Sequence, residues 1–145
     1  MSLLRLAGAI NVQVVAGGDL FAAGEASPGA PWRIGIRHPE AHDRVAAVLA
    51  ISNLAVATSG LYERGGHIRD PHTGRVADDL ASFTVVGPTL AMADAYATAA
   101  FAMGEGGLEW IARQPGYGGL AITRDARVVW TQLVDELLVP AQART

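Results

Sequence analysis

The first part of the chain contains continuous apolar segments and one segment in which apolar and polar residues alternate, and both patterns are typical of strands. Residues Ile10–Ala16 are rich in valine and end at a Gly-Gly-Asp sequence, which predicts a buried strand closed by a tight turn. Apolar and polar residues alternate along Trp32–Arg37, which predicts a second strand. Val45–Ser52 is a third apolar segment. Extended structure is therefore indicated for much of this region.

The second part of the chain adds helices to this pattern. Ser82–Gly87 predicts a strand, and Leu90–Met103 predicts the clearest helix, with Pro88-Thr89 as stop and cap before it and Gly104 after it. Further predicted elements are a short helix at Gly107–Gln114, a hairpin of Leu120–Thr123 with Arg127–Thr131, and a terminal helix at Gln132–Leu138. We expect residues 1–145 to form a single α+β unit, in which helices pack on a mixed sheet.

The composition shows an excess of apolar residues. Half of the 145 residues are apolar, 17% are charged and the mean hydropathy is +0.24, which is high for a soluble monomer of this size. Either the core is large or an apolar face is buried against another surface. A net charge of -3 argues against nucleic-acid binding. The absence of Cys excludes disulfides, iron–sulfur clusters and thiolate zinc sites.

The longest charge-free segment, Val45–Tyr62, does not have the character of a membrane span. Ser52, Asn53 and Ser59 are among the polar residues that interrupt it, so no window reaches the twenty or so apolar residues that a spanning helix needs. The sequence shows no signal peptide and no cysteine for a lipid anchor. We expect no membrane span and, by default, a cytoplasmic location.

Asp94 and Thr98 form the first candidate site. They are four residues apart on the predicted helix, so both side chains lie on one face, about one turn apart. The rest of this helix is uncharged, and a carboxylate in apolar surroundings is costly unless it is paired or binds a metal. Oxygen ligands of this kind suit Mg²⁺, which completes its shell with water and phosphate. Alternatively, Asp94 lies in solvent and Thr98 bonds back to a helix carbonyl.

The sequence GGHIRDPHTG, residues 65–74, forms the second candidate site. His67 in such a polar loop can act as a general base near neutral pH. His67, Asp70 and His72 also allow a transition-metal site, although their spacing matches no standard zinc pattern. The alternative is an exposed polar turn in which Asp70 caps its own backbone.

Five sequence blocks occur in an order and at a spacing that point to one family. They are Val15–Asp19, Trp32–Ile36, Ala57–Gly60, His67–Gly74 and Ala93–Thr98. The most specific feature is H-I-x-D-P-x-T-G followed at this distance by A-D-A-x-x-T. With these blocks, nearly the whole chain up to the hairpin resembles the ApbE-type FAD:protein FMN transferases, which are flavin transferases.

This resemblance implies an ApbE-like fold and a Mg²⁺-dependent transfer of FMN from FAD to a threonine hydroxyl of an acceptor protein, with release of AMP. It implies that Asp94 and Thr98 are metal ligands, together with Ala97, which stands where some members have another Asp. His67 would deprotonate or orient the incoming hydroxyl. The implied contacts to the flavin nucleotide are Ile68, Arg69, Thr58, Ser59 and Gly60.

The resemblance covers only the C-terminal half of the family pattern. The first half, which supplies much of the FAD pocket and a further metal contact, has no counterpart here, and Leu61 and Val15 replace a usual Asp and Asn. We therefore expect transfer to need the absent N-terminal half, and the isolated chain to be inactive. The alternative is a non-catalytic ApbE-like binding or assembly module that forms a homo-oligomer through an apolar face.

Overall fold

The computed structural model describes residues 2–41, 43–61 and 68–140, which form short helices and antiparallel strands. In chain order the elements are α1 (Ser2–Leu6), β1 (Val12–Ala16), β2 (Asp19–Ala23), β3 (Trp32–Arg37), β4 (Val45–Ile51), β5 (Leu54–Gly60), β6 (Leu80–Gly87), α3 (Leu90–Ala102), α4 (Gly106–Ala112), β7 (Gly118–Thr123), β8 (Val128–Trp130) and α5 (Gln132–Leu137). The α+β class expected from the sequence is confirmed.

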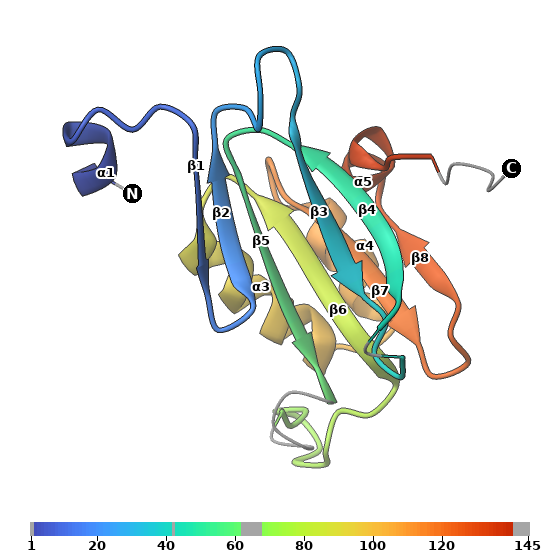
Figure 1. The fold of residues 1–145 in the computed structure, drawn as a ribbon. Helices are drawn as coiled ribbons and strands as arrows, with labels where there is room; N and C mark the ends of the chain where they lie inside the picture. The colour runs from blue at the N-terminus through green and yellow to red at the C-terminus, as the bar shows by residue number, and fades with distance from the viewer. Residues whose placement is uncertain (1, 42, 62–67, 141–145) are drawn as a thin grey trace, which may run out of the picture.

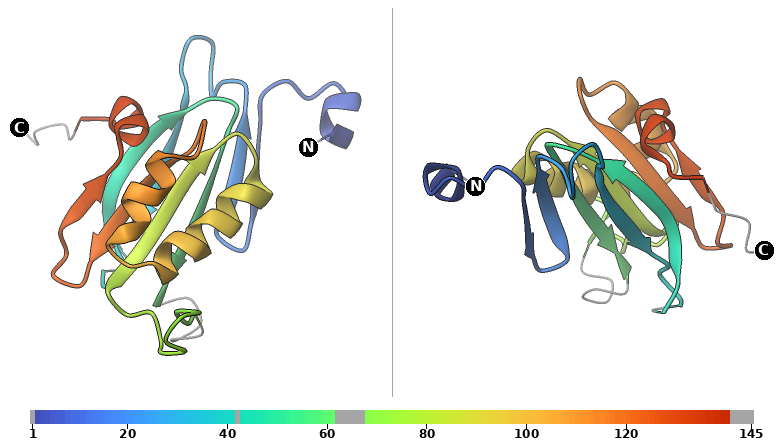
Figure 2. Two further views of the ribbon diagram at one scale, coloured as in Figure 1. Left: turned by 180° about the vertical axis from the view of Figure 1, so that it is seen from behind. Right: turned by 45° about the horizontal axis from the view of Figure 1, so that its top comes forward.

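Six strands form one sheet in the order β1-β2-β5-β6-β7-β8, and β3 and β4 form a separate hairpin (Figure 1). Every strand pairing in the described part of the chain is antiparallel, so the expected mixed sheet is wrong in this detail. The reason lies between β6 and β7, which are neighbours in the sheet. Two helices, α3 and α4, connect them, so the chain crosses the sheet twice before it enters β7, which therefore runs antiparallel to β6 (Figure 2).

The six-stranded sheet is covered on both faces. Helices α3 and α4 lie on one face, and the β3–β4 hairpin lies on the other, together with α5 (Figure 2). Strand β6 runs between the two layers and is buried at all eight positions. A strand covered on both sides is expected to be apolar throughout, as most of β6 is.

Strand β1 differs from its prediction. It forms where expected, but four of its five side chains are exposed, so the expected burial is wrong. It lies at the edge of the sheet and, among the described residues, pairs with β2 only. The turn after it is confirmed, with positive φ angles at Gly17 and Gly18.

Strands β2 and β5 were not predicted. The turn between β4 and β5 consists of only two polar residues, so the two strands read as one apolar segment in the sequence. Asn53 in this turn has a φ angle of 55°.

The predicted helices are confirmed within one or two residues. Helix α3 ends at Ala102, and Gly104 follows with φ 62°, as expected of a helix stop. Thr89 precedes α3 in an extended conformation, but its hydroxyl contacts the hydroxyl of Tyr117 at 3.1 Å and does not cap the helix. Within residues 2–41, 43–61 and 68–140, no helix has both the length and the apolar character needed to cross a bilayer.

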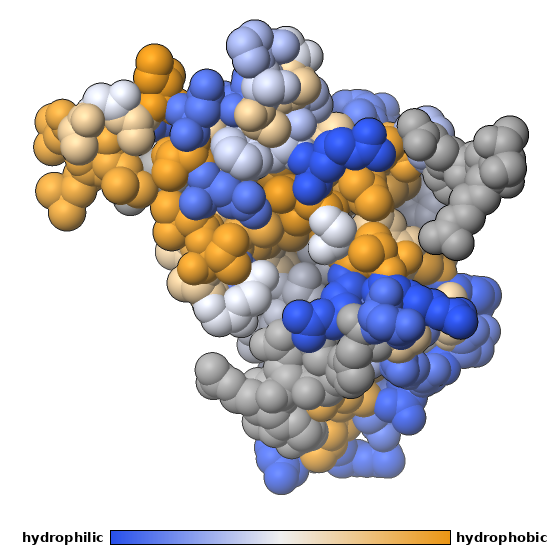
Figure 3. All heavy atoms as spheres, in the orientation of Figure 1, coloured by the Kyte–Doolittle hydropathy of each residue, from blue (hydrophilic) through white to orange (hydrophobic). Residues whose placement is uncertain are grey.

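Apolar side chains gather on the surface around α1 and β1. Leu3, Leu6 and Ile10 are each more than four-fifths exposed, and Val15 is 59% exposed. Figure 3 shows these hydrophobic residues as a group at the β1 edge of the molecule. Part of the excess hydrophobicity of the sequence therefore lies on this surface and does not enter the core.

Candidate functional site

Several of the residues singled out from the sequence meet at one end of the sheet. Strand β5 ends there at Gly60, β6 begins there at Leu80, and the loop that carries Ile68 and Arg69 lies between them in sequence (Figure 1). The second half of α3 passes over the same end, because its Thr98 contacts β5. Residues distant in sequence are thus brought together by one strand pair and one helix.

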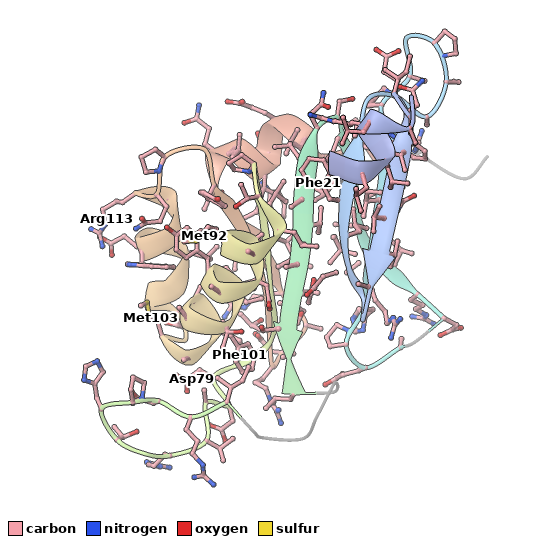
Figure 4. The ribbon with its side chains drawn as sticks, turned by 90° about the vertical axis from the view of Figure 1, so that its left-hand side faces the viewer. Phe21, Asp79, Met92, Phe101, Met103 and Arg113 are labelled. Carbon is pink, nitrogen blue, oxygen red and sulfur yellow. The ribbon has the colours of Figure 1, made fainter. Side chains whose placement is uncertain are left out.

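Helix α3 lies close to the sheet because its inner face consists of small residues. Ala93, Ala97 and Ala100 are fully buried, and Phe101 fills the space toward the end of the helix (Figure 4). Asp94 is exposed. The expectation that this carboxylate lies in apolar surroundings is therefore wrong. The buried apolar residues of α3 face the sheet, and Asp94 is not among them.

Thr98 is exposed but its hydroxyl has a partner on the sheet. Its Oγ1 lies 3.1 Å from the Oγ of Ser59 on β5, and either hydroxyl can donate in this hydrogen bond. Ser59 itself is 9% exposed. The alternative in which Thr98 bonds to a carbonyl of its own helix is therefore not what the structure contains.

Thr58 points to the opposite face of the sheet from Ser59, because successive side chains of a strand alternate. Its Oγ1 lies 2.8 Å from the Oγ1 of Thr84 on β6, and its N–H donates to Oδ1 of Asp19 at 3.1 Å. Gly60 pairs with Ser82 in the same ladder. Asp19, which the sequence indicated only as part of a turn, thus joins the start of β2 to β5.

The loop residues expected near the flavin occupy different environments. His67 lies outside the described residues. Ile68 is 8% exposed and belongs to the core beneath α3, so its side chain is a packing residue. Arg69 is exposed, and its guanidinium donates to the carbonyl of Gly74 at 2.9 Å. Of this pair, Arg69 alone presents its side chain to solvent.

Asp70 organises the turn that follows. The N–H of His72 donates to its Oδ1 at 2.9 Å, and the Thr73 hydroxyl donates to its Oδ2 at 2.7 Å. These two donors, the His72 backbone first, hold the pKa of Asp70 below its ordinary value. Gly74 closes the turn with φ 69°. The polar-turn interpretation of Asp70 is confirmed, and both carboxylate oxygens are engaged within the loop.

The donor set on α3 fits Mg²⁺ better than a transition metal. Asp94 and Thr98 are two exposed residues with oxygen-bearing side chains, whereas Ala97 is fully buried and offers only its carbonyl. Among the residues that the structure describes, no three His, Asp or Glu side chains gather into a metal site. Mg²⁺ is commonly held by one or two carboxylates, with water and substrate phosphates completing its shell, so the carboxylate of Asp94 and the hydroxyl of Thr98 match its needs.

A surface hollow of about 430 Å³ lies beside this site, between the loop and the end of α3. Its lining includes Asp70, Arg75, Asp79 and Met103, but neither Asp94 nor Thr98. Figure 4 shows Asp79 and Met103 next to the last turn of α3. The hollow is therefore a separate feature from Asp94 and Thr98.

Comparisons with known proteins identify relatives of this chain. The profile of the ApbE family matches residues 1–120. The FAD:protein FMN transferase of Escherichia coli K12 is 32% identical over 133 residues, which cover 85% of this chain and 38% of that protein. The corresponding protein of Haemophilus influenzae is 37% identical over 106 residues, covering 66% of this chain and 31% of that protein.

Solved structures of the same family have a similar fold. The flavin transferase ApbE from Vibrio cholerae superposes with a TM-score of 0.79 at 31% identity, covering 94% of this chain and 47% of that one. The ApbE protein of Thermotoga maritima gives a TM-score of 0.76 at 30% identity, with 90% and 45% covered. The chain thus spans about two-fifths of the length of the curated relatives and nearly half of the solved structures. Since the family profile covers most of its residues, the chain belongs to the ApbE family.

Proposed function

We propose that this chain supplies the metal-binding part of a Mg²⁺-dependent flavin transferase, which moves FMN from FAD to a threonine hydroxyl of an acceptor protein. The observation that carries this proposal is the pair Asp94 and Thr98, exposed one turn apart on α3, with Thr98 held against β5. The names of the relatives, which are FAD:protein FMN transferases, support the reaction class.

The proposed reaction is a single phosphoryl substitution. The threonine oxygen of the acceptor forms a bond to the phosphorus of the FMN phosphate, and the bond from that phosphorus to the bridging oxygen breaks. AMP leaves with the bridging oxygen, and the threonine proton goes to a base. Mg²⁺, when bound, supplies charge neutralisation on the pyrophosphate oxygens.

The residues of this chain take distinct roles in the proposal. Asp94 provides a charged ligand for the metal, and Thr98 provides a neutral oxygen. His67 accepts the threonine proton or orients the hydroxyl. Arg69, whose side chain is exposed, provides a guanidinium contact to the flavin nucleotide. The remaining part of the FAD pocket comes from a polypeptide equivalent to the first half of the relatives, so the isolated chain is inactive.

Mass spectrometry tests this proposal directly. The chain is incubated with FAD, Mg²⁺ and a threonine-containing acceptor peptide, with and without the N-terminal half of a relative such as the Vibrio cholerae protein. We expect the mass of an FMN phosphoester on threonine only when both halves are present. Asp94→Ala should abolish the product, whereas Glu109→Ala, at an exposed site on α4, should not. Transfer that survives Asp94→Ala would contradict the proposal.

A second candidate function is a non-catalytic assembly module. The exposed apolar group of Leu3, Leu6, Ile10 and Val15 favours it, because such a surface is typical of a protein interface. In this case the chain forms a stable homo-oligomer without any metal dependence. Sedimentation velocity with and without Mg²⁺ distinguishes the two functions, and a monodisperse monomer would exclude assembly through this surface.

A further inference from the structure

The hydroxyl of Ser59 joins the sheet to α3 beside the proposed metal ligands. It comes from β5, a strand held between β2 and β6, and it is 9% exposed. Its Oγ lies 3.1 Å from Oγ1 of Thr98. The partner helix is held against the sheet by Ala93, Ala97 and Ala100, all fully buried. The hydrogen bond therefore connects two well-packed elements.

When Thr98 binds a cation, its hydroxyl is the donor and Ser59 the acceptor in this hydrogen bond. A hydroxyl carries one proton and two lone pairs. An oxygen that offers a lone pair to a cation has to point its proton elsewhere, and the Oγ of Ser59 is within reach to accept it. The contact then leaves a lone pair of Thr98 available for the cation.

The same contact selects the rotamer of Thr98. Threonine in a helix divides between two χ1 rotamers, because its hydroxyl can bond a carbonyl three or four residues earlier. For Thr98 those carbonyls belong to Ala95 and Asp94. Without a partner on β5 the hydroxyl is free to form this local bond, which competes with metal binding.

We infer that Ser59 is a positioning residue for the metal ligand Thr98, and that it acts through this hydroxyl and not as a contact to the flavin nucleotide. The inference rests on the proposed function, because it concerns the same metal site. Thr58, its neighbour in sequence, has no part in it, since its hydroxyl bonds Thr84 on the other face of the sheet.

Binding of Mn²⁺ alone, used as a spectroscopic substitute for Mg²⁺, tests the inference on the full chain. Electron paramagnetic resonance counts free Mn²⁺ during titration and does not require catalytic activity. Ser59→Ala should weaken Mn²⁺ binding by about 10-fold, in the range measured when a residue that supports a metal ligand is removed. Ser59→Thr, which keeps the hydroxyl, should restore most of the affinity.

Two controls separate positioning from a general loss of structure. Thr84→Val removes a buried hydroxyl from the adjacent strand, and we expect the Mn²⁺ affinity of the folded protein to stay unchanged. In a Thr98→Ala background, Ser59→Ala should cause no further loss, because Ser59 acts through Thr98. Circular dichroism verifies that each variant is folded before titration.

The outcomes distinguish this inference from the proposed function. If Ser59→Ala binds Mn²⁺ like the wild type, or still weakens binding in the Thr98→Ala background, the positioning role is wrong and the metal site stands. If Asp94→Ala leaves the affinity unchanged, or the wild type binds no Mn²⁺, the proposed metal site on α3 fails and the positioning role fails with it.

Discussion

The two faces of the central sheet are packed in different ways. The face under α3 and α4 is lined mainly by small side chains, with a few aromatic rings, whereas the face under the β3–β4 hairpin is filled by branched aliphatic side chains. Representative residues are Ala57, Ala93 and Ala97 on the helix side, and Ile34, Leu49 and Ile51 on the hairpin side.

The candidate site therefore lies on the helix side of the sheet, whereas most of the branched aliphatic side chains pack on the hairpin side. Small residues let α3 approach β5 closely enough for the Ser59–Thr98 hydrogen bond, which joins two layers. On the hairpin side, the hydroxyls of Thr58 and Thr84 pair within the sheet itself. We therefore expect substitutions on the hairpin side to change stability alone, and substitutions on the helix side to change the site as well.

The largest expected effect is on the hairpin side. Leu49→Ala removes a fully buried side chain and should lower the free energy of unfolding by about 2–5 kcal/mol, because the packing cannot fully close the cavity. Urea denaturation measures this loss. Val45→Ala, on the same strand but 58% exposed, should change it by less than about 0.5 kcal/mol. Equal losses for the two variants would contradict the layer assignment.

A smaller effect is expected between the two helices. A Cβ at Gly107 would overlap the backbone carbonyl of Ala100 on α3, so Gly107→Ala forces α4 to shift and should cost about 1–3 kcal/mol in stability. At Gly106 a Cβ enters open space, and Gly106→Ala should be neutral or slightly stabilising. If α3 moves with α4, Gly107→Ala should also weaken the proposed Mn²⁺ binding. Thermal denaturation of this matched pair gives the comparison, and similar melting temperatures would argue against close contact of the helices.

The turn at Asp70 is expected to contribute a pH-dependent stability. Since the His72 N–H and the Thr73 hydroxyl lower the pKa of Asp70 in the folded chain, its charged form stabilises the fold above the unfolded pKa of about 3.9. This contribution is lost as the pH falls through the lower, folded pKa. Asp70→Asn should therefore be less stable than the wild type at neutral pH, and the difference should shrink in acid.

Denaturation curves at several pH values between 7 and about 2.5 measure this difference across the range in which carboxylates titrate. Asp78→Asn, at an exposed carboxylate of the same loop, controls for the loss of one negative charge. A wild-type advantage that stays constant down to the lowest pH would show that the Asp70 charge is not responsible.

The smallest effect on stability is expected at the sheet edge. Val15→Lys replaces a 59% exposed side chain on β1 and should change the free energy of unfolding by less than about 0.5 kcal/mol. A charge on an edge strand opposes pairing with another strand, so any self-association should fall. Sedimentation velocity at matched concentrations tests this, and an unchanged sedimentation profile of an oligomeric wild type would exclude the β1 edge as its interface.

Much of the local structure followed from the sequence because it depends on neighbouring residues. Alternation predicted the strand at Trp32–Arg37, and Pro88 with Gly104 delimited the helix that became α3. Strand β5 was missed, since its apolar residues continue those of β4 with only a short polar turn between them. The exposure of β1 was missed because a valine-rich segment looks the same in a central strand and in an edge strand.

The sequence by itself determined the family, through motifs with a characteristic order. It also predicted that Asp94 and Thr98 lie one turn apart on the same helix, through their spacing of four residues. Only the tertiary structure decided that Asp94 is exposed, that Ile68 is a core residue and that Ser59 reaches Thr98. Ser59 and Thr98 are 39 residues apart, and no periodicity links them. Their contact exists because small residues on the inner face of α3 let this helix pack closely on β5. Packing between a helix and a sheet depends on residues distant in sequence, so no local pattern predicts it.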